Sequence, residues 1–208
     1  MGIAERKQLE KHARRQLILD SAADIFHEKG FARATMEDIA ARAQIAVGTI
    51  YLYYKSKADI YFSLTKSALA DLSNRLKRIA GNKQNDPDVK IRKLMSAVEA
   101  FYVQDRDAYE LISHKTASDL IQLFPEDNLE TIRQIMRSNL KQMEIVIEEG
   151  IQKGIYKKIN PYAGAVVFWS SFMGTIDFQE NRMVQGKKDY RKATLELFTE
   201  LMLAGLKK

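Results

Sequence analysis

Residues 35–61 read TMEDIAARAQIAVGTIYLYYKSKADIY, and this stretch decides the fold because it contains two helix starts and a tight turn. Thr35 is followed three residues later by Asp38, which is the spacing of a capping box, and the same Ser-x-x-Asp spacing begins at Ser56. The link Gln44-Ile45-Ala46 is long enough for little more than a turn. The stretch therefore predicts helices at 36–43, 47–54 and 57–80.

An apolar face on the preceding segment gives the two short helices something to pack against. Its residues recur at helical spacing, namely Ile18, Ala22, Ile25 and Phe26. We place this helix at 8–29. Gly30 follows it and readily adopts a left-handed conformation, which lets Phe31 fold back onto Phe26. A tight helical pair supported by a longer helix is the helix-turn-helix arrangement.

The outward face of the helix at 47–54 suits the major groove of DNA. A helical wheel puts Val47, Ile50 and Tyr54 on the core side. The opposite arc carries Gly48, Thr49, Leu52 and Lys55, with Tyr51 and Tyr53 at its borders. A threonine can hydrogen-bond a base edge and a leucine can contact a thymine methyl, while tyrosines and lysines reach phosphates. The N-termini of the neighbouring helices add free N–H groups for phosphate. The alternative is a generic helical hairpin whose pattern arises by chance.

The basic charge of the chain is densest near the N-terminus. The net charge is +6, and residues 1–57 carry +3 of it. The densest basic stretch contains Arg6, Lys7, Lys11, Arg14 and Arg15, with Glu5 and Glu10 opposing. Such a stretch is either a solvated terminus or an arm attracted to a polyanion, and charge alone does not separate the two.

The composition otherwise fits a globular protein of a reducing compartment. Hydrophobic residues make up 46% and charged residues 29%, and there is no cysteine, so disulfides and thiolate metal sites are excluded. No N-terminal stretch combines a basic start with an apolar run, as a signal peptide does. The longest apolar stretch, 163–173, is too short to span a bilayer. We expect a cytoplasmic protein with no membrane partner.

The rest of the chain is also predicted to be helical. No segment alternates with a period of two, and Pro87, Pro125 and Pro161 each stand where a helix can begin. Further helices are expected at 87–104, 106–122, 126–153, 161–183 and 188–206. The fold class is therefore all-α, with about nine helices.

The stretch 35–61 resembles the signature of the tetracycline-repressor (TetR) family. The Thr-x-x-Asp-Ile-Ala start, the Gly-Thr-Ile-Tyr-x-Tyr core and the Lys-Ser-Lys end occur together at family spacing, and the resemblance covers about residues 12–62. The chain departs from the pattern at Gln44 for the usual Gly, Ala46 for the capping Ser, Tyr54 for Phe and Ala58 for Glu. These changes affect the turn and the cap rather than the presumed base contacts.

The resemblance implies a homodimeric transcription repressor that a small-molecule effector releases from its operator. It implies a DNA-binding domain at 1–56 and a ligand-binding and dimerisation domain at 57–208. Matched by position, the DNA contacts of the family fall on Thr35, Thr49, Tyr51, Leu52, Tyr53 and Lys57. With the wheel, the candidate DNA-binding residues are Thr35, Val47, Gly48, Thr49, Tyr51, Leu52, Tyr53, Lys55 and Lys57.

The C-terminal part matches the family only in its layout. The helices at 161–183 and 188–206 stand where the family pairs two subunits in a four-helix bundle, although their apolar residues could also form the core of one subunit. The predicted dimer interface consists of Val167, Phe172, Ile176, Leu195, Phe198, Leu201 and Met202.

Aromatic and apolar residues on the middle helices are candidates for a ligand site. They are Phe101, Tyr102, Tyr109, Phe168, Trp169 and Met173, and at helical spacing each is either core or pocket wall. The phrases Gly48-Thr-Ile-Tyr-Leu-Tyr and Gly174-Thr-Ile-Asp are similar to acyl-coenzyme A-responsive regulators of fatty-acid degradation within the family. That similarity implies a long-chain acyl-coenzyme A, or another apolar molecule, as the effector.

An enzyme and a helical adaptor are the two alternatives to a regulator. For an enzyme, His12, His27 and His114 are scattered over different helices, Glu148-Glu149 reads as a solvated face, and no nucleophile elbow or glycine-rich phosphate loop is present. We therefore expect no catalytic residue, no cofactor and no metal. A helical ligand-binding adaptor without sequence-specific DNA binding would explain the bundle but not the outward arc at 48–55.

Overall fold

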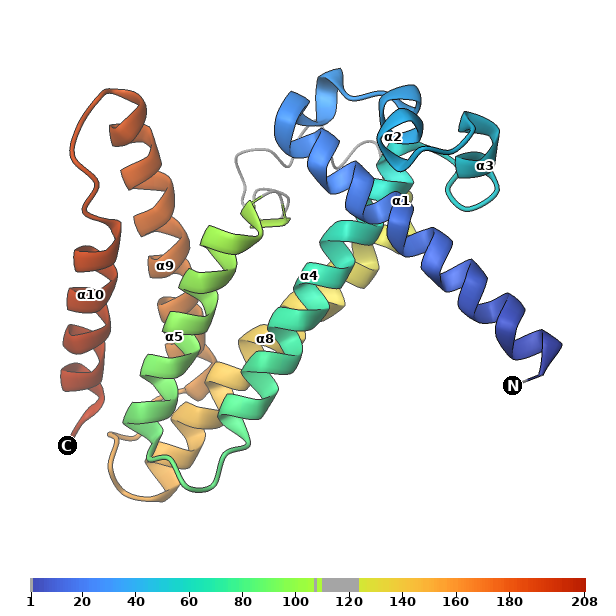
Figure 1. Cartoon of the computed structure of the whole chain (residues 1–208). Helices are drawn as coiled ribbons and strands as arrows, with labels where there is room; N and C mark the ends of the chain where they lie inside the picture. Colours follow the sequence, from blue (N-terminus) through green and yellow to red (C-terminus); the bar gives the residue numbers. More distant parts are fainter. Residues whose placement is uncertain (1, 107, 110–123) are drawn as a thin grey trace.

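The computed structural model describes residues 2–106, 108–109 and 124–208, which fold into helices (Figure 1). The helices described are α1 Ile3–Arg33, α2 Met36–Ala43, α3 Val47–Tyr51, α4 Lys57–Ala80, α5 Pro87–Gln104, α8 Glu126–Gln152, α9 Pro161–Val184 and α10 Arg191–Leu206. Within these ranges the one β-type pairing is an isolated bridge between Tyr156 and Lys207. The all-α prediction is confirmed. The helix predicted at 106–122, with His114, lies almost entirely outside the described residues.

The two predicted helix starts are confirmed. Thr35 Oγ1 accepts a hydrogen bond from Asp38 N at 3.1 Å, and the Asp38 carboxylate accepts one from Thr35 N at 3.2 Å. Ser56 Oγ accepts from Asp59 N at 3.2 Å. The Asp59 carboxylate, however, accepts from Lys55 N at 3.1 Å, so this second box closes one residue early. With these caps, α2 and α4 have the predicted bounds.

α1 is longer than the predicted helix 8–29. It begins at Ile3, and all of residues 2–17 are exposed except the half-buried Arg15, so this part has no buried stripe. Gly30 breaks the helix at φ +75°, after which the chain continues helically to Arg33. The Phe31 ring lies 5.6 Å from the Phe26 ring, as the sequence predicted. We call residues 2–17 the arm; it projects from the body of the molecule and ends at the N-terminus (Figure 1).

α3 is shorter than the predicted helix 47–54. Tyr53 N and Tyr54 N both donate to Ile50 O, at 2.8 and 3.0 Å, so the chain tightens into a turn after Tyr51. Ser56 then has an extended backbone, which it needs in order to cap α4. Tyr54 is 1% exposed, and its burial holds this turn against the core.

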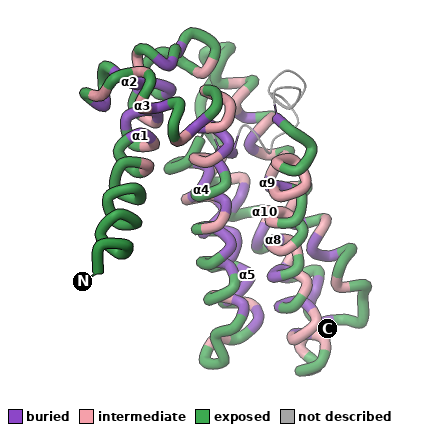
Figure 2. The backbone as a smooth tube through the Cα atoms, turned by 90° about the vertical axis from the view of Figure 1, so that its right-hand side faces the viewer, coloured by how far each residue is buried: buried purple, intermediate pink, exposed green. Residues whose placement is uncertain are grey.

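α4 joins the helix-turn-helix to the C-terminal bundle. Near its start, the Tyr61 ring packs edge-on against Phe26 of α1 at 5.4 Å. Further along, α4 packs against α5 and α8, α8 packs against α9, and α9 packs against α10. Buried residues continue along α4 in Figure 2, from Ile60 through Leu69 to Leu76. The domain boundary between residues 56 and 57 remains a prediction, because α4 packs against α1 of the DNA-binding part as well as against α5 and α8 of the bundle.

Candidate DNA interface and ligand cavity

α3 exposes the face that the helical wheel assigned to DNA. Ile50 is 0% exposed and Val47 is half-buried, which fixes α3 on the core. Leu52 is 81% exposed and Tyr51 is 53% exposed. An apolar side chain gains no burial energy at such an exposed position unless a partner covers it. The other outward residues are exposed at Gly48 and Lys55 and half-buried at Thr49 and Tyr53. The structure therefore brings these residues together on one surface.

The turn before α3 contains a strained residue. Gln44 has φ 53° and ψ 43°, and it is the one non-glycine residue with positive φ among those described. This left-handed conformation brings the Cβ of an L residue close to its own backbone. Glycine has no Cβ, which explains why it is the usual residue at this position of the family pattern. Ala46 begins α3 without a side-chain cap. Both departures from the family pattern thus have the expected structural effect.

Lys57 fastens the end of α1 to the start of α4. Its ammonium group donates to Phe31 O at 2.8 Å, Ala32 O at 3.1 Å and Ala34 O at 2.9 Å. A lysine ammonium has three N–H donors, so these carbonyls use all of them. Thr35 is likewise engaged as the cap of α2. The proposed phosphate contacts of Thr35 and Lys57 stay predictions, and both side chains have a structural task as well.

Ion pairs hold α2 against α1. Lys29 pairs with Asp38 at 2.6 Å, and this hydrogen bond holds the pKa of the Asp38 carboxyl below its usual value, although desolvation opposes the shift. Arg42 reaches Glu28 at 2.6 Å and Asp24 at 3.2 Å. These contacts join α2 to α1, but exposed ion pairs contribute little to stability.

The arm and the turn that follows α3 form the two sides of a basic groove. The residues lining it are Lys7, Glu10, Lys11, Arg14, Leu52 and Tyr53. Three cations against one carboxylate make the groove attractive to a phosphate backbone. At the base of the arm, the Arg15 guanidinium lies 4.7 Å from the centre of the Tyr54 ring. Burial raises the pKa of the Tyr54 hydroxyl, and the nearby Arg15 charge opposes that rise.

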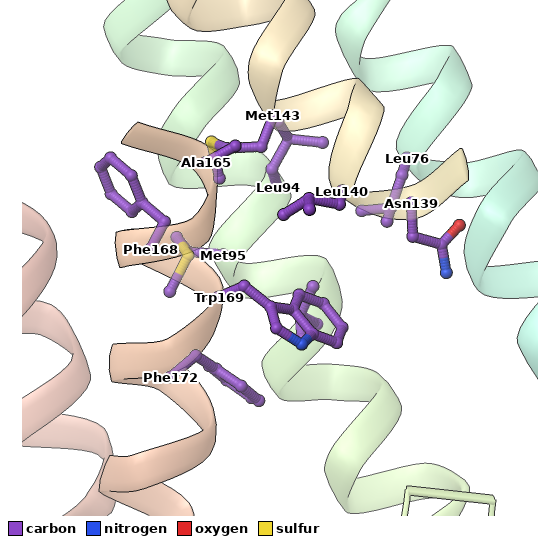
Figure 3. A pocket seen from close by; sticks show the side chains of 11 residues that line it. Leu76, Leu94, Met95, Asn139, Leu140, Met143, Ala165, Phe168, Trp169 and Phe172 are labelled. Atoms are coloured by element: carbon purple, nitrogen blue, oxygen red, sulfur yellow. The ribbon is translucent and has the colours of Figure 1, made fainter. Parts of the chain in front are cut away.

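A narrow apolar cavity lies in the bundle between α4, α5, α8 and α9 (Figure 3). Its lining consists of Leu76, Leu94, Met95, Val98, Asn139, Leu140, Met143, Ala165, Phe168, Trp169 and Phe172. The cavity has a volume of about 20 Å³, which is room for about one water molecule. A larger ligand would have to move lining side chains, and the two flexible methionines are the easiest to move.

Of the six predicted ligand-binding residues, Phe168 and Trp169 line this cavity. Phe101 lies instead in a polar groove between α4 and α5 that also contains Arg75 and Arg78. Met173 is half-buried and is not part of the lining. The sequence missed Asn139 and the leucines of α4, α5 and α8 because our list favoured aromatic residues.

Tyr102 belongs to a polar cluster beyond the cavity, and the Tyr109 ring packs edge-on against Tyr102 at 4.9 Å. Tyr102 donates to Glu180 Oε1 at 2.6 Å and accepts a hydrogen bond from Arg191, while Arg106 pairs with Glu180 at 2.8 Å. Burial, reinforced by Glu180, raises the pKa of Tyr102 to about 12. Burial also raises the pKa of Tyr109, whose ring packs edge-on against Phe172. These tyrosines join α5, α9 and α10 rather than line the cavity.

The residues of the predicted dimer interface differ in their exposure within one subunit. Phe172 and Ile176 are each 1% exposed and Leu195 is 5% exposed, so these three pack inside the subunit and are not available to a second one. Phe198 and Met202 are half-buried, while Val167 and Leu201 are exposed. The exposed apolar residues of α9 and α10 are Tyr162, Val167, Phe178, Met183, Val184, Leu197 and Leu201. For Phe172, Ile176 and Leu195 the structure therefore favours the alternative that the sequence left open, a place in the core of one subunit.

Two features are absent from the described residues. None of the helices in that part of the chain is long and apolar enough to cross a membrane. The same residues contain no group of three or more His, Cys, Asp and Glu side chains placed to hold a metal ion.

These features define a class of protein, a helix-turn-helix regulator that binds DNA. A tightly turned helix pair presents an exposed reading face, with a basic arm beside it. Residues 18–64 match the family described as bacterial regulatory proteins, tetR family. This match confirms the resemblance to the TetR family that the motif at 35–61 indicated.

Three similar proteins cover between 70% and 95% of the chain. The fatty acid metabolism regulator protein of Bacillus subtilis (strain 168) is 25% identical over 201 residues, which are 95% of this chain and 97% of that protein. The transcriptional repressor KstR2 of Mycolicibacterium smegmatis is 27% identical over 145 residues, 70% of this chain and 68% of that protein. The structure of Bacillus subtilis FadR in complex with stearoyl-CoA superposes with a TM-score of 0.70 at 23% identity, covering 92% of this chain and 98% of that one.

Proposed function

We propose that this chain is a homodimeric transcriptional repressor that an apolar effector releases from its operator. The observation that carries the DNA-binding part is the exposed face of α3, where Leu52 is 81% exposed beside a groove lined by Lys7, Lys11 and Arg14. A repressor that binds chromosomal DNA acts in the bacterial cytoplasm. The competing adaptor function would leave both the apolar reading face and the basic groove without a role.

Dimerisation is supported by the exposed apolar residues of α9 and α10. Val167 and Phe178 lie eleven residues apart on α9, which puts them on the same face of the helix. Leu197 and Leu201 lie one turn apart on α10. A two-fold interface needs the same patch on each subunit, and pairing through these helices would set two recognition helices about 34–36 Å apart for successive major grooves.

The apolar cavity supports an elongated apolar effector, and we propose a long-chain acyl-coenzyme A. The Bacillus subtilis regulators named above act in fatty acid metabolism or were solved with stearoyl-CoA, which makes this ligand class the first to test. The cavity lining supplies no cation for the nucleotide. Arg75 and Arg78 in the groove between α4 and α5 are cations that could meet its phosphates, although Asp71 and Asp105 line the same groove.

The switch would work through α4. A cavity of about 20 Å³ has to widen before an acyl chain enters, and widening moves α4 relative to α8. α4 begins beneath the helix-turn-helix, so its tilt changes the spacing of the two recognition helices. Release follows only if the effector prefers the spacing that does not fit DNA. A coupling of about 1–3 kcal/mol would weaken DNA binding roughly 5- to 150-fold.

The test is a titration of genomic duplex fragments at several salt concentrations, with and without acyl-coenzyme A of several chain lengths. Specific, salt-dependent binding that acyl-coenzyme A weakens supports the whole proposal. An Arg75→Gln/Arg78→Gln variant should lose its response to the thioester but keep its response to a fatty-acid methyl ester. Failure to bind any duplex would favour the adaptor, and binding that no chain length affects would remove the acyl thioester alone.

A further inference from the structure

The cavity of the bundle contains one carboxamide in an otherwise apolar wall. Asn139 is the single amide among the 11 described lining residues, and the other ten are aliphatic, thioether or aromatic. The side chain is 3% exposed and lies beside Leu76 of α4 (Figure 3). A buried amide in such surroundings is unfavourable unless each of its polar atoms has a partner.

One half of this amide has a partner and the other half has none. Ser73 Oγ, on α4 and itself 6% exposed, donates a hydrogen bond to Asn139 Oδ1 at 2.6 Å. Asn139 Nδ2 is buried, and none of the described residues accepts a hydrogen bond from it. An unsatisfied buried donor destabilises the protein, and an acceptor brought by a ligand would remove that penalty.

We propose that Asn139 is the polar anchor of the effector site and selects apolar ligands that bear a hydrogen-bond acceptor. This inference rests on the proposed function, in which the cavity takes the effector. The matching ligand class has an aliphatic body and one carbonyl, as in a ketone, an ester or a thioester. The body packs against Phe168 and Trp169, while the carbonyl oxygen accepts from Asn139 Nδ2.

The same contact connects the ligand to α4 directly. Asn139 belongs to α8 and its oxygen is held by Ser73 of α4, so a ligand that engages the amide acts on the hydrogen bond between these two helices. Through this hydrogen bond, a bound effector can change the position of α4, and with it the helix-turn-helix, whatever the length of its aliphatic body.

Trp169 makes the experiment direct, because it is the single tryptophan of the chain and lines the cavity. Binding of 2-octanone and of octane is measured by Trp169 fluorescence without DNA, for the wild type and for Asn139→Leu. The ratio of the two dissociation constants should shift about tenfold against the ketone in Asn139→Leu, which is one neutral hydrogen bond. Comparing ratios cancels the different solubilities of the probes.

Two further variants keep the result interpretable. Met143→Leu changes the same wall without a polar atom and should leave the ratio unchanged. Ser73→Ala/Asn139→Leu removes both partners of the hydrogen bond, so no buried serine hydroxyl is left without a partner. The ratio of the dissociation constants should show the same tenfold shift in this variant. An unchanged ratio in both Asn139 variants, or no response of Trp169 to either probe, would overturn the proposal. Duplex binding of the same proteins is scored separately, so loss of the anchor is distinct from loss of the proposed function.

Discussion

Lys57 has a structural task in addition to the phosphate contact predicted for it. The ammonium group holds three carbonyls at the end of α1, so Lys57→Ala should lower the free energy of unfolding by about 1–2 kcal/mol. Urea unfolding measures this change. Lys55→Ala, at an exposed position nearby, should stay within about 0.5 kcal/mol of the wild type. Unchanged stability with weaker binding to every duplex would make Lys57 a phosphate contact instead.

Gln44 gives the opposite expectation, because its backbone is already in a conformation that glycine adopts freely. Gln44→Gly should raise the free energy of unfolding by about 0.5–1 kcal/mol, since relief of left-handed strain exceeds the added freedom of the unfolded chain. Gln134→Gly, in the exposed middle of α8, should instead lower it by about 1 kcal/mol. A loss of stability at Gln44 would mean that its side chain holds the turn.

Thr49 and Leu52 are the residues that should read bases. Replacing either with alanine should relax the sequence preference at one position of each half-site by about 1–3 kcal/mol while overall duplex binding persists. Selection from a random duplex pool measures the preference. Val89→Ala, 39% exposed on α5, serves as the control and should select the wild-type site. Unaltered selection by both variants would place the reading face elsewhere on α3.

At the scale of elements, the arm should contribute several phosphate contacts at once. Neutralising Lys7, Lys11 and Arg14 to glutamine should reduce the slope of log affinity against log salt by up to about 2.7 for each subunit that binds, since each contact contributes about 0.9. The control removes the same charge from exposed sites far from α3, at Lys83, Lys93 and Lys158. An equal change of slope in both variants would reduce the arm to a general charge effect.

Local signals predicted the helix starts well, whereas signals that depend on surroundings were less reliable. The capping residues Thr35 and Ser56 act within one turn, so the sequence contains all the information that they need. The start of α1 was missed because an exposed helix shows no apolar periodicity. The end of α3 was missed because Tyr54 belongs to the apolar pattern even though its backbone has already left the helix.

For the sites, the sequence predicted which face of α3 is exposed but not which residues line the cavity of the bundle. A short helix with one buried side has a single possible phase, fixed by Ile50. α9 is apolar on several sides, so Phe172, buried within the subunit, and Val167, exposed, could not be told apart from spacing alone. Which residues line a cavity depends on four helices at once, and no pattern in one of them identifies Asn139.

At the scale of the whole molecule, the exposed patch of α9 and α10 should decide the oligomeric state. Leu201 is 63% exposed in the subunit, so Leu201→Glu should leave the fold intact but place an unpaired charge in a two-fold interface. Light scattering should then give the mass of a monomer, and operator binding should be lost. Lys192→Glu, on another side of α10, should remain dimeric. A dimeric Leu201→Glu protein would place the interface on other helices.

α4 also bears on how regulators of this kind diversify. Its first turns, with Tyr61, pack against the DNA-binding part, while in its later turns Leu76 lines the cavity and Ser73 bonds to Asn139 of the lining. A recombination event at a loop on either side of α4 would therefore separate residues that must fit each other. Exchange of effector specificity between relatives should succeed with crossovers inside α4, between Phe62 and Leu69, where one helix can be spliced to another without disturbing either set of contacts.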